Sequence, residues 1–284
     1  MMRISATRLF PYLLPVAMLG MSPAWADADV YDKPLAIKKV HLPRDPQDPS
    51  GKRELACYSY PAYTIKQLDF GEVGAERLSV LPAVDGKVAP CRQAKESDEY
   101  VLPPEMWSGY FAGAKAEYAF FTASDGVNGG MGFIVVRLAD KKKLFEDVYE
   151  KNFSSITLRD GVPLLHYRRV HAADCSAVTD GVTCMQAIAR ATGVAQASLA
   201  MCAKGYKSAA ESLARERCKA DGKNDAACLA RELAVIRKQK WDASPSVVVY
   251  EVETDLHESA APDRPLPGPS IKPLGDALSC RPAD

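Results

Sequence analysis

The chain has 284 residues, 47% of them hydrophobic, and its 36 basic side chains balance its 36 acidic ones. This composition excludes a disordered chain and a collagen-like repeat, and it argues against a protein that coats nucleic acid. The length suits one large or two small domains, either of which can bury a hydrophobic core.

The N-terminal segment has the pattern of a cleaved secretory signal peptide. Two arginines precede an apolar stretch over residues 9–21, and residues 24–26 read Ala-Trp-Ala, the small-x-small sequence that signal peptidase recognises. An uncleaved membrane anchor is the alternative, but prolines interrupt the uncharged run and a spanning helix needs about 20 apolar residues. We therefore expect removal of residues 1–26 and a periplasmic or secreted protein without a transmembrane anchor.

All eight cysteines follow the expected cleavage site. An even number of cysteines in an exported chain predicts disulfides, whereas zinc sites favour closer cysteine spacings than this chain offers. Short spacing favours two of the pairs, the N-terminal half holds only two cysteines, and elimination leaves the last pair. The expected disulfides are Cys57–Cys91, Cys175–Cys184, Cys202–Cys280 and Cys218–Cys228.

Residues 36–172 have the pattern of short strands separated by turns. Runs rich in Val, Ile, Tyr and Phe alternate with clusters of Gly, Asp, Asn and Pro, and KLFEDVY and SSITL read as two separate strands. Asp-Gly pairs at 85–86 and 160–161 are typical of tight hairpins. The sequence therefore predicts a mainly β antiparallel meander, for which a sandwich, a barrel and propeller-like blades all remain open.

Residues 182–241 change to helical periodicity. Thr183 to Gln186 fits a capping box, Thr192-Gly193 supplies a stop, and Asp225 suits the start of a last helix. A strand pattern returns after this region, so we expect a disulfide-linked helical insertion at 182–241 within a single β-rich domain spanning 27–284, α+β overall.

The C-terminal tail, residues 256–284, is rich in proline. Because proline lacks a backbone N–H, we expect no regular structure there, with Cys280 holding the tail to the helical region.

Charge is distributed unevenly between the two kinds of structure. Residues 181–241 hold 11 basic and five acidic side chains. A basic helical surface could contact an anionic partner or the acidic β part of the same domain. The alternative is that exposed helices use lysine and arginine for solubility.

Sequence motifs for catalysis are absent. The chain has no nucleophile elbow, phosphate loop or dinucleotide-binding fingerprint. The loop over residues 124–130, Ser-Asp-Gly-Val-Asn-Gly-Gly, offers Asp125 and Asn128 as calcium ligands; the alternative is a glycine-rich hairpin turn without a metal. We expect no other cofactor.

Aromatic side chains gather in two stretches of the β part. If exposed they form a recognition surface, since aromatic residues concentrate at binding hot spots; if buried they are strand core. The candidates are Tyr58, Tyr60, Trp107 and Tyr110.

These patterns favour a non-enzymatic binding protein of the cell envelope or exterior, braced by disulfides. It would engage another protein, for example as an inhibitor or an immunity-type factor, and we expect no nucleic-acid partner. The alternative is a secreted hydrolase of glycan or ester substrates whose active site carries no recognised motif. The sequence assigns no catalytic residue.

Overall fold

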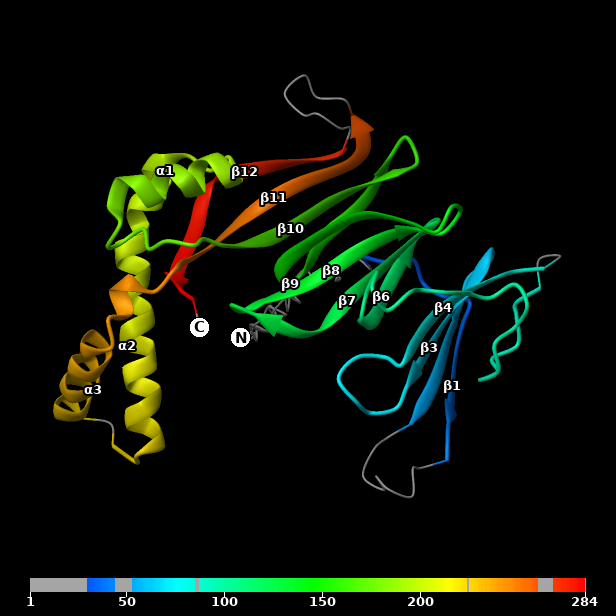
Figure 1. Ribbon diagram of the computed structural model, residues 1–284, viewed down its shortest axis with the longest axis horizontal. Coiled ribbons are helices and arrows are strands. Elements are labelled where there is room, and N and C mark those ends of the chain that lie inside the picture. The colour runs from blue at the N-terminus through cyan, green and yellow to red at the C-terminus, as the bar shows by residue number, and fades with distance from the viewer. Residues whose placement is uncertain (1–29, 44–52, 85–86, 224, 260–267, 284) are drawn as a thin grey trace, which may run out of the picture.

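The computed structural model describes residues 30–43, 53–84, 87–223, 225–259 and 268–283 (Figure 1). The expected signal peptide and the Asp-Gly pair at 85–86 lie outside these ranges. Within them the chain is mostly antiparallel β structure with a smaller helical region, as the sequence predicts.

The strands form two sheets, each built from antiparallel neighbours. The first sheet runs in chain order through β1 (Ala36–His41), β2 (Glu54–Ser59), β3 (Tyr63–Asp69), β4 (Arg77–Pro82) and β5 (Tyr100–Val101). The second runs through β6 (Gly109–Lys115), β7 (Tyr118–Val127), β8 (Gly130–Arg137), β9 (Lys142–Arg159), β10 (Val162–Ala172), β11 (Ser246–Ser259) and β12 (Gly268–Pro282).

The helical region lies between β10 and β11, which are neighbours in the same sheet. The helices are therefore an insertion between two strands of one sheet, as the sequence indicates. They are α1 (Gly181–Thr192), the short 3-10 helix η1 (Gln196–Met201), α2 (Cys202–Ala220), α3 (Ala226–Lys238) and the 3-10 turn η2 (Trp241–Ala243).

The ends of these helices agree with the sequence at two points and differ at one. Gly193 ends α1 with a left-handed φ of 74°, and the Asp225 side chain accepts a hydrogen bond from the backbone N of Cys228 at 2.7 Å. The capping box at Thr183 is wrong, because α1 already begins at Gly181 after Asp180. The Asp180 carboxylate instead accepts a hydrogen bond from the backbone N of Ser176.

Two expectations for the strands are also wrong. The runs KLFEDVY and SSITL form one strand, β9, whose register shifts against β10 absorb the irregular residues as bulges. The expected irregular tail is also wrong where the structure describes it, because residues 256–259 end β11 (Ser246–Ser259) and Gly268–Pro282 form β12; residues 260–267 lie outside the described ranges. Because β12 is at the edge of its sheet, a missing backbone N–H on its outer side costs no ladder hydrogen bond. The turn at 160–161 is as predicted, with positive φ at Asp160 and Gly161.

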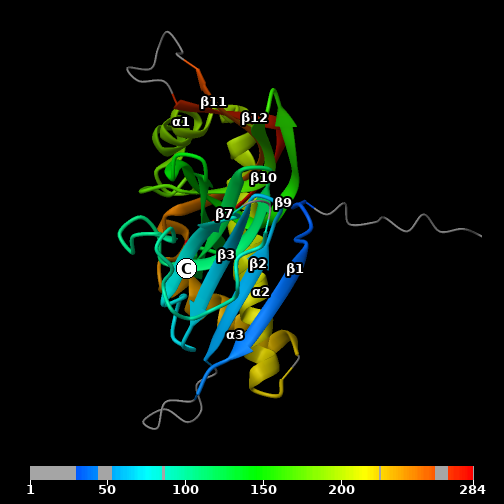
Figure 2. The same ribbon diagram turned by 90° about the vertical axis from the view of Figure 1, so that its right-hand side faces the viewer.

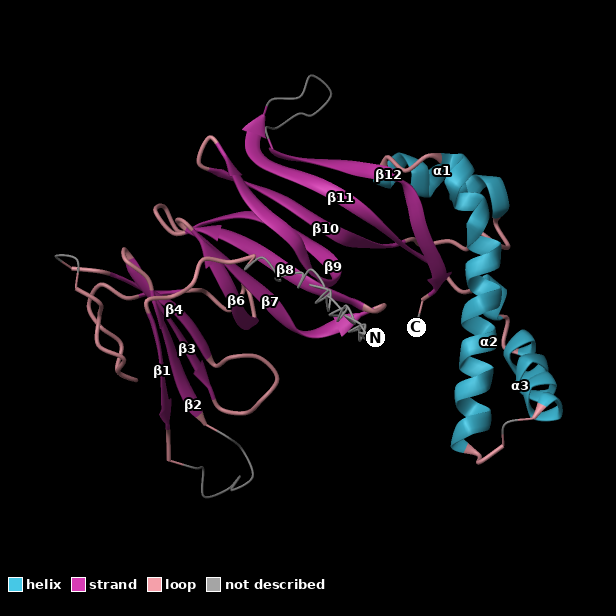
Figure 3. Ribbon diagram, turned by 180° about the vertical axis from the view of Figure 1, so that it is seen from behind, coloured by secondary structure: helices cyan, strands magenta, loops and turns pink. Residues whose placement is uncertain are grey.

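The seven-stranded sheet is the central layer. Side chains alternate across it, so Phe121 and Ile134 pack against the five-stranded sheet while Phe120 and Phe133 face the opposite core, which continues into the helices. The five-stranded sheet and the α2–α3 pair lie at opposite ends of the molecule, as Figure 3 shows from behind. Figure 2 looks onto the five-stranded sheet, with α2 and α3 behind it.

The disulfides are Cys57–Cys91, Cys175–Cys184, Cys202–Cys280 and Cys218–Cys228, the same pairs that the sequence analysis expects. Several disulfides in one chain are typical of proteins from oxidising compartments. None of the helices described here combines the length and apolar character needed to cross a membrane.

Candidate functional site

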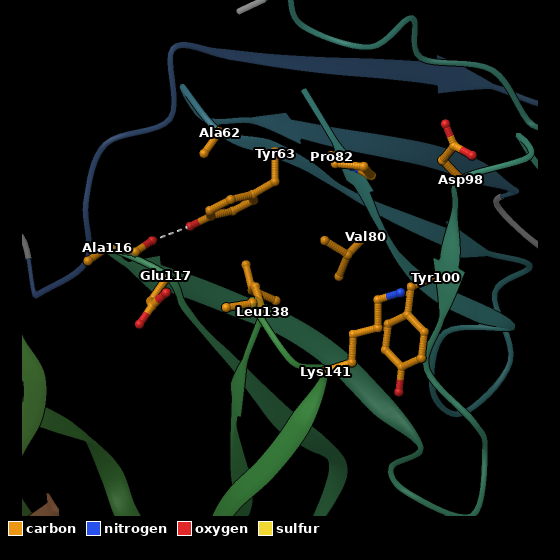
Figure 4. Close-up of a pocket in the computed structure, with 11 residues that line it drawn as sticks. Ala62, Tyr63, Val80, Pro82, Asp98, Tyr100, Ala116, Glu117, Leu138 and Lys141 are labelled. Atoms are coloured by element: carbon orange, nitrogen blue, oxygen red, sulfur yellow. Dashed lines mark hydrogen bonds between the residues drawn. The ribbon is translucent and has the colours of Figure 1, made fainter. Parts of the chain in front are cut away.

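The two sheets enclose a cavity of about 430 Å³ next to the turns that follow β6 and β8 (Figure 4). This volume lies within the range of small-ligand pockets, which are mostly apolar and carry a few polar groups. The lining follows that rule, with apolar side chains predominating around three charged ones. The lining includes Tyr63, Val80, Pro82, Asp98 and Tyr100 from the side of the five-stranded sheet, and Ala116, Glu117, Leu138 and Lys141 from the two turns.

Two contacts join the sheets across this cavity. The Tyr63 hydroxyl donates a hydrogen bond to the carbonyl oxygen of Ala116 at 2.7 Å, which Figure 4 shows as a dashed line. Burial raises the pKa of Tyr63, so its hydroxyl keeps the proton that it donates. The Lys141 ammonium lies 5.2 Å from the centre of the Tyr100 ring, within the range of a cation–π contact. These contacts fix the distance between the walls.

The turns that form one wall are held in uncommon backbone conformations. Ala116 and Lys141 have φ values of 51° and 62°, a left-handed region that non-glycine residues rarely adopt. The Asp32 carboxylate accepts a hydrogen bond from the backbone N of Ala116 at 2.6 Å. Hydrogen bonds from the Arg137 guanidinium to Asp140, at 3.0 and 2.6 Å, hold the pKa of that carboxyl below its usual value. The wall is therefore formed before any ligand arrives.

A second cavity of about 400 Å³ adjoins the first. Both are lined by Pro82 and Asp98, and we call the two neighbouring cavities together the seam groove. The second cavity adds further apolar residues, among them Val84, Val88 and Pro90.

A buried ionic cluster lies behind the groove wall. Glu99 follows Asp98 in the chain, and its carboxylate accepts hydrogen bonds from Lys66 at 2.6 Å and from the Ser79 hydroxyl at 2.5 Å. The Lys66 and Glu99 side chains are 1% and 0% exposed. Burial alone would raise the pKa of Glu99, but the hydrogen bonds from Lys66, Ser79 and the backbone N of Glu96 outweigh burial and lower it.

This cluster combines serine, lysine and a carboxylate, as some hydrolases do. Ser79 is fully buried and its hydroxyl already donates to Glu99, so a substrate has no access to its oxygen. Lys66 also donates to the carbonyl oxygen of Ala94 at 3.2 Å. The cluster therefore fastens the loop before β5 to strands β3 and β4, and through that loop it positions Asp98.

The aromatic residues proposed from the sequence lie mainly in the interface between the sheets. Tyr60 keeps only 4% of its surface exposed, so an exposed recognition role is wrong for this residue. Its burial and the nearby Asp32 charge raise its pKa to about 12. The Tyr58 ring packs 4.9 Å from that of Phe111. The other two candidates are partly buried and hydrogen-bonded to backbone, and they are Trp107 and Tyr110.

The calcium candidates lie on the β7–β8 hairpin. Asp125 is within β7. Asn128 and Gly129, which form the tight turn, both have positive φ. The Arg281 guanidinium donates to the carbonyl oxygen of Asn128 at 2.9 Å, which places a positive charge beside one of the oxygens that calcium would use. Calcium binding at Asp125 and Asn128 stays a prediction.

The part of the chain that the structure describes contains one group of three metal-ligating side chains. It consists of Cys175, Asp180 and Cys184, and its two sulfurs are joined in a disulfide.

No protein-family model matches this chain, and no curated protein and no solved structure matches it either.

Proposed function

We propose that this chain is an exported, non-enzymatic binding protein of the cell envelope or exterior, which holds a segment of a partner protein in the seam groove. The observation that carries the proposal is the preformed, mostly apolar cavity of about 430 Å³ between the two sheets. A site whose walls are already fixed loses little freedom on binding, which favours affinity.

The shape of the groove suits an extended segment. Two cavities of similar volume follow one another and share Pro82 and Asp98. In an extended chain every second side chain points to the same side, so two such side chains could enter the two cavities. The carboxylates of Asp98 and Glu117 and the ammonium of Lys141 border the first cavity and would orient the polar backbone or charged neighbours of the segment.

Site-specific photo-crosslinking in cells that export the protein tests this proposal. A photoreactive residue replaces Ala139, which is exposed and lines the first cavity, and a matched variant carries it at Ser154, exposed on β9 away from the groove. We expect a discrete cross-linked protein from position 139 that position 154 does not give. Leu138→Arg, which fills the cavity, should abolish this product while the circular dichroism spectrum stays unchanged.

Equal cross-linking from both positions, or a product at position 139 that survives Leu138→Arg, would reject the groove as the binding site.

A further inference from the structure

Helices α2 and α3 form a hairpin at the end of the molecule opposite the five-stranded sheet (Figures 1 and 3), whose residues line the seam groove. At its base, Gly205 of α2 lies so close to β12 that an added Cβ would be 1.9 Å from the carbonyl oxygen of Cys280. The Tyr206 hydroxyl donates to the carbonyl oxygen of Ser244 at 2.7 Å. Farther out, the Cys218–Cys228 disulfide joins the two helices.

The hairpin carries a surplus of exposed cations. Arg217 and Arg231 pair with acids of the hairpin itself, Arg217 with Glu232 at 3.9 Å and Arg231 with Glu232 at 3.1 Å and Asp221 at 3.8 Å. Eight other basic side chains in and just after the hairpin are exposed and make no ion pair with any residue that the structure describes. They are Lys204, Lys207, Arg215, Lys219, Lys223, Arg237, Lys238 and Lys240.

Three of these cations lie on one side of α2. Lys204, Arg215 and Lys219 are separated by 11 and 4 residues, spacings that return to the same side of a helix with 3.6 residues per turn. Lys223 follows four residues later, beyond the C-terminal end of α2. Glu211 lies on the same side between Lys204 and Arg215, so the positive charge on this side is concentrated toward the C-terminal half of α2.

The hairpin exposes few large apolar side chains for a specific protein partner to bury. Between Cys202 and Lys240, Val235 is the one large hydrophobic side chain with substantial exposure among the described residues. The core of a protein–protein interface is apolar and depleted of charge, whereas attraction to an anionic membrane surface needs only clustered cations.

We propose that the α2–α3 hairpin docks on an anionic, phosphate-bearing membrane surface. The charge of the rest of the protein favours one orientation on the membrane. Residues 27–180 and 242–284 together carry 23 basic and 31 acidic side chains. That part is repelled by a negative surface while the hairpin is attracted. The protein therefore lies hairpin-down, with the seam groove facing away from the membrane and open to a partner.

Vesicle co-sedimentation of the oxidised, processed protein tests this docking. The vesicles contain phosphatidylcholine alone or with 30% phosphatidylglycerol, at low and at high salt. We expect binding to the anionic vesicles only, with loss in high salt. A hairpin variant carries Lys204→Glu, Arg215→Glu, Lys219→Glu and Lys223→Glu. Its affinity should fall at least about tenfold, since each basic residue near the surface contributes to binding.

A matched variant changes the net charge equally at four exposed lysines outside the hairpin, with Lys33→Glu, Lys38→Glu, Lys95→Glu and Lys151→Glu. We expect it to lose less than about threefold, and thermal unfolding of both variants checks that they fold. Equal losses in the two variants would show a net-charge effect and overturn the proposal. The proposal would also be overturned if the unaltered protein did not bind anionic vesicles at low salt. That outcome includes the case in which the hairpin cross-links to an acidic protein instead.

Discussion

Different interactions stabilise the two ends of the molecule. At the seam groove, buried side chains from both sheets interlock and an ion pair lies fully inside the protein. In the hairpin, α3 buries only Cys228 and Ile236, so its position depends largely on the Cys218–Cys228 disulfide and on a few contacts at its base. The groove is therefore made rigid by packing and the hairpin by a covalent bond, and each can be disturbed without the other.

The largest effect should come from Glu99→Ala. Removing one partner of a buried ion pair leaves Lys66 charged and uncompensated in the interior, which costs about 3–5 kcal/mol of unfolding free energy. Urea unfolding followed by fluorescence measures the loss. A double variant, Lys66→Met with Glu99→Leu, should recover most of it, because no charge remains buried. A double variant as unstable as Glu99→Ala would show that shape, not charge, dominates this site.

The same carboxylate gives a pH dependence with a defined sign. The pKa of Glu99 is lowered in the folded protein, whereas an unfolded glutamate titrates near about 4.3. Below about pH 5 the unfolded chain therefore binds protons more readily, and the stabilisation by Glu99 is lost as the pH falls through its folded pKa. The stability difference between the unaltered protein and Glu99→Gln should shrink over this interval in urea titrations, and a constant difference would contradict the assignment.

The next largest effect should be confined to the hairpin. Replacing Cys218 and Cys228 by alanine removes a crosslink that closes a loop of about 10 residues, worth about 2–3 kcal/mol in the chain-entropy model. Hydrogen exchange should accelerate in α3 and the outer half of α2 and stay unchanged in β3 and β4. The Cys175–Cys184 pair, with a similar separation of 9, is the matched control whose removal should leave α3 protected. Uniform acceleration would contradict the independence of the two ends.

Local patterns predicted most of the fold because each depends on nearby residues. The Asp-Gly turn at 160–161, the Gly193 stop and the Asp225 cap all follow from neighbours in the chain. The prolines of β12 give a wrong local prediction because their effect depends on where the strand lies in the sheet. Their tolerance depends on β12 being at a sheet edge beside β11, which is a tertiary property.

The groove itself could not be predicted. Its first cavity combines residues as far apart in the chain as Ala62 and Lys141, which meet only because the two sheets pack together. Lys66 is buried in the middle of β3, and a buried lysine needs a partner. Nothing in the sequence identifies Glu99 as that partner, because the two are 33 residues apart.

The smallest effect should come from Tyr63→Phe, which removes the hydroxyl that joins β3 to the turn after β6. Because Ala116 is exposed, water can replace the lost donor, so unfolding should weaken by only about 0.5–1 kcal/mol. The matched change is Tyr60→Phe, at a neighbouring ring whose hydroxyl makes no hydrogen bond to the described residues, and it should be near neutral. If the hydroxyl of Tyr63 fixes the width of the groove, cross-linking from position 139 should fall in Tyr63→Phe and persist in Tyr60→Phe. Equal cross-linking in both would show that packing alone holds the walls apart, and the hydroxyl would then be dispensable for the site.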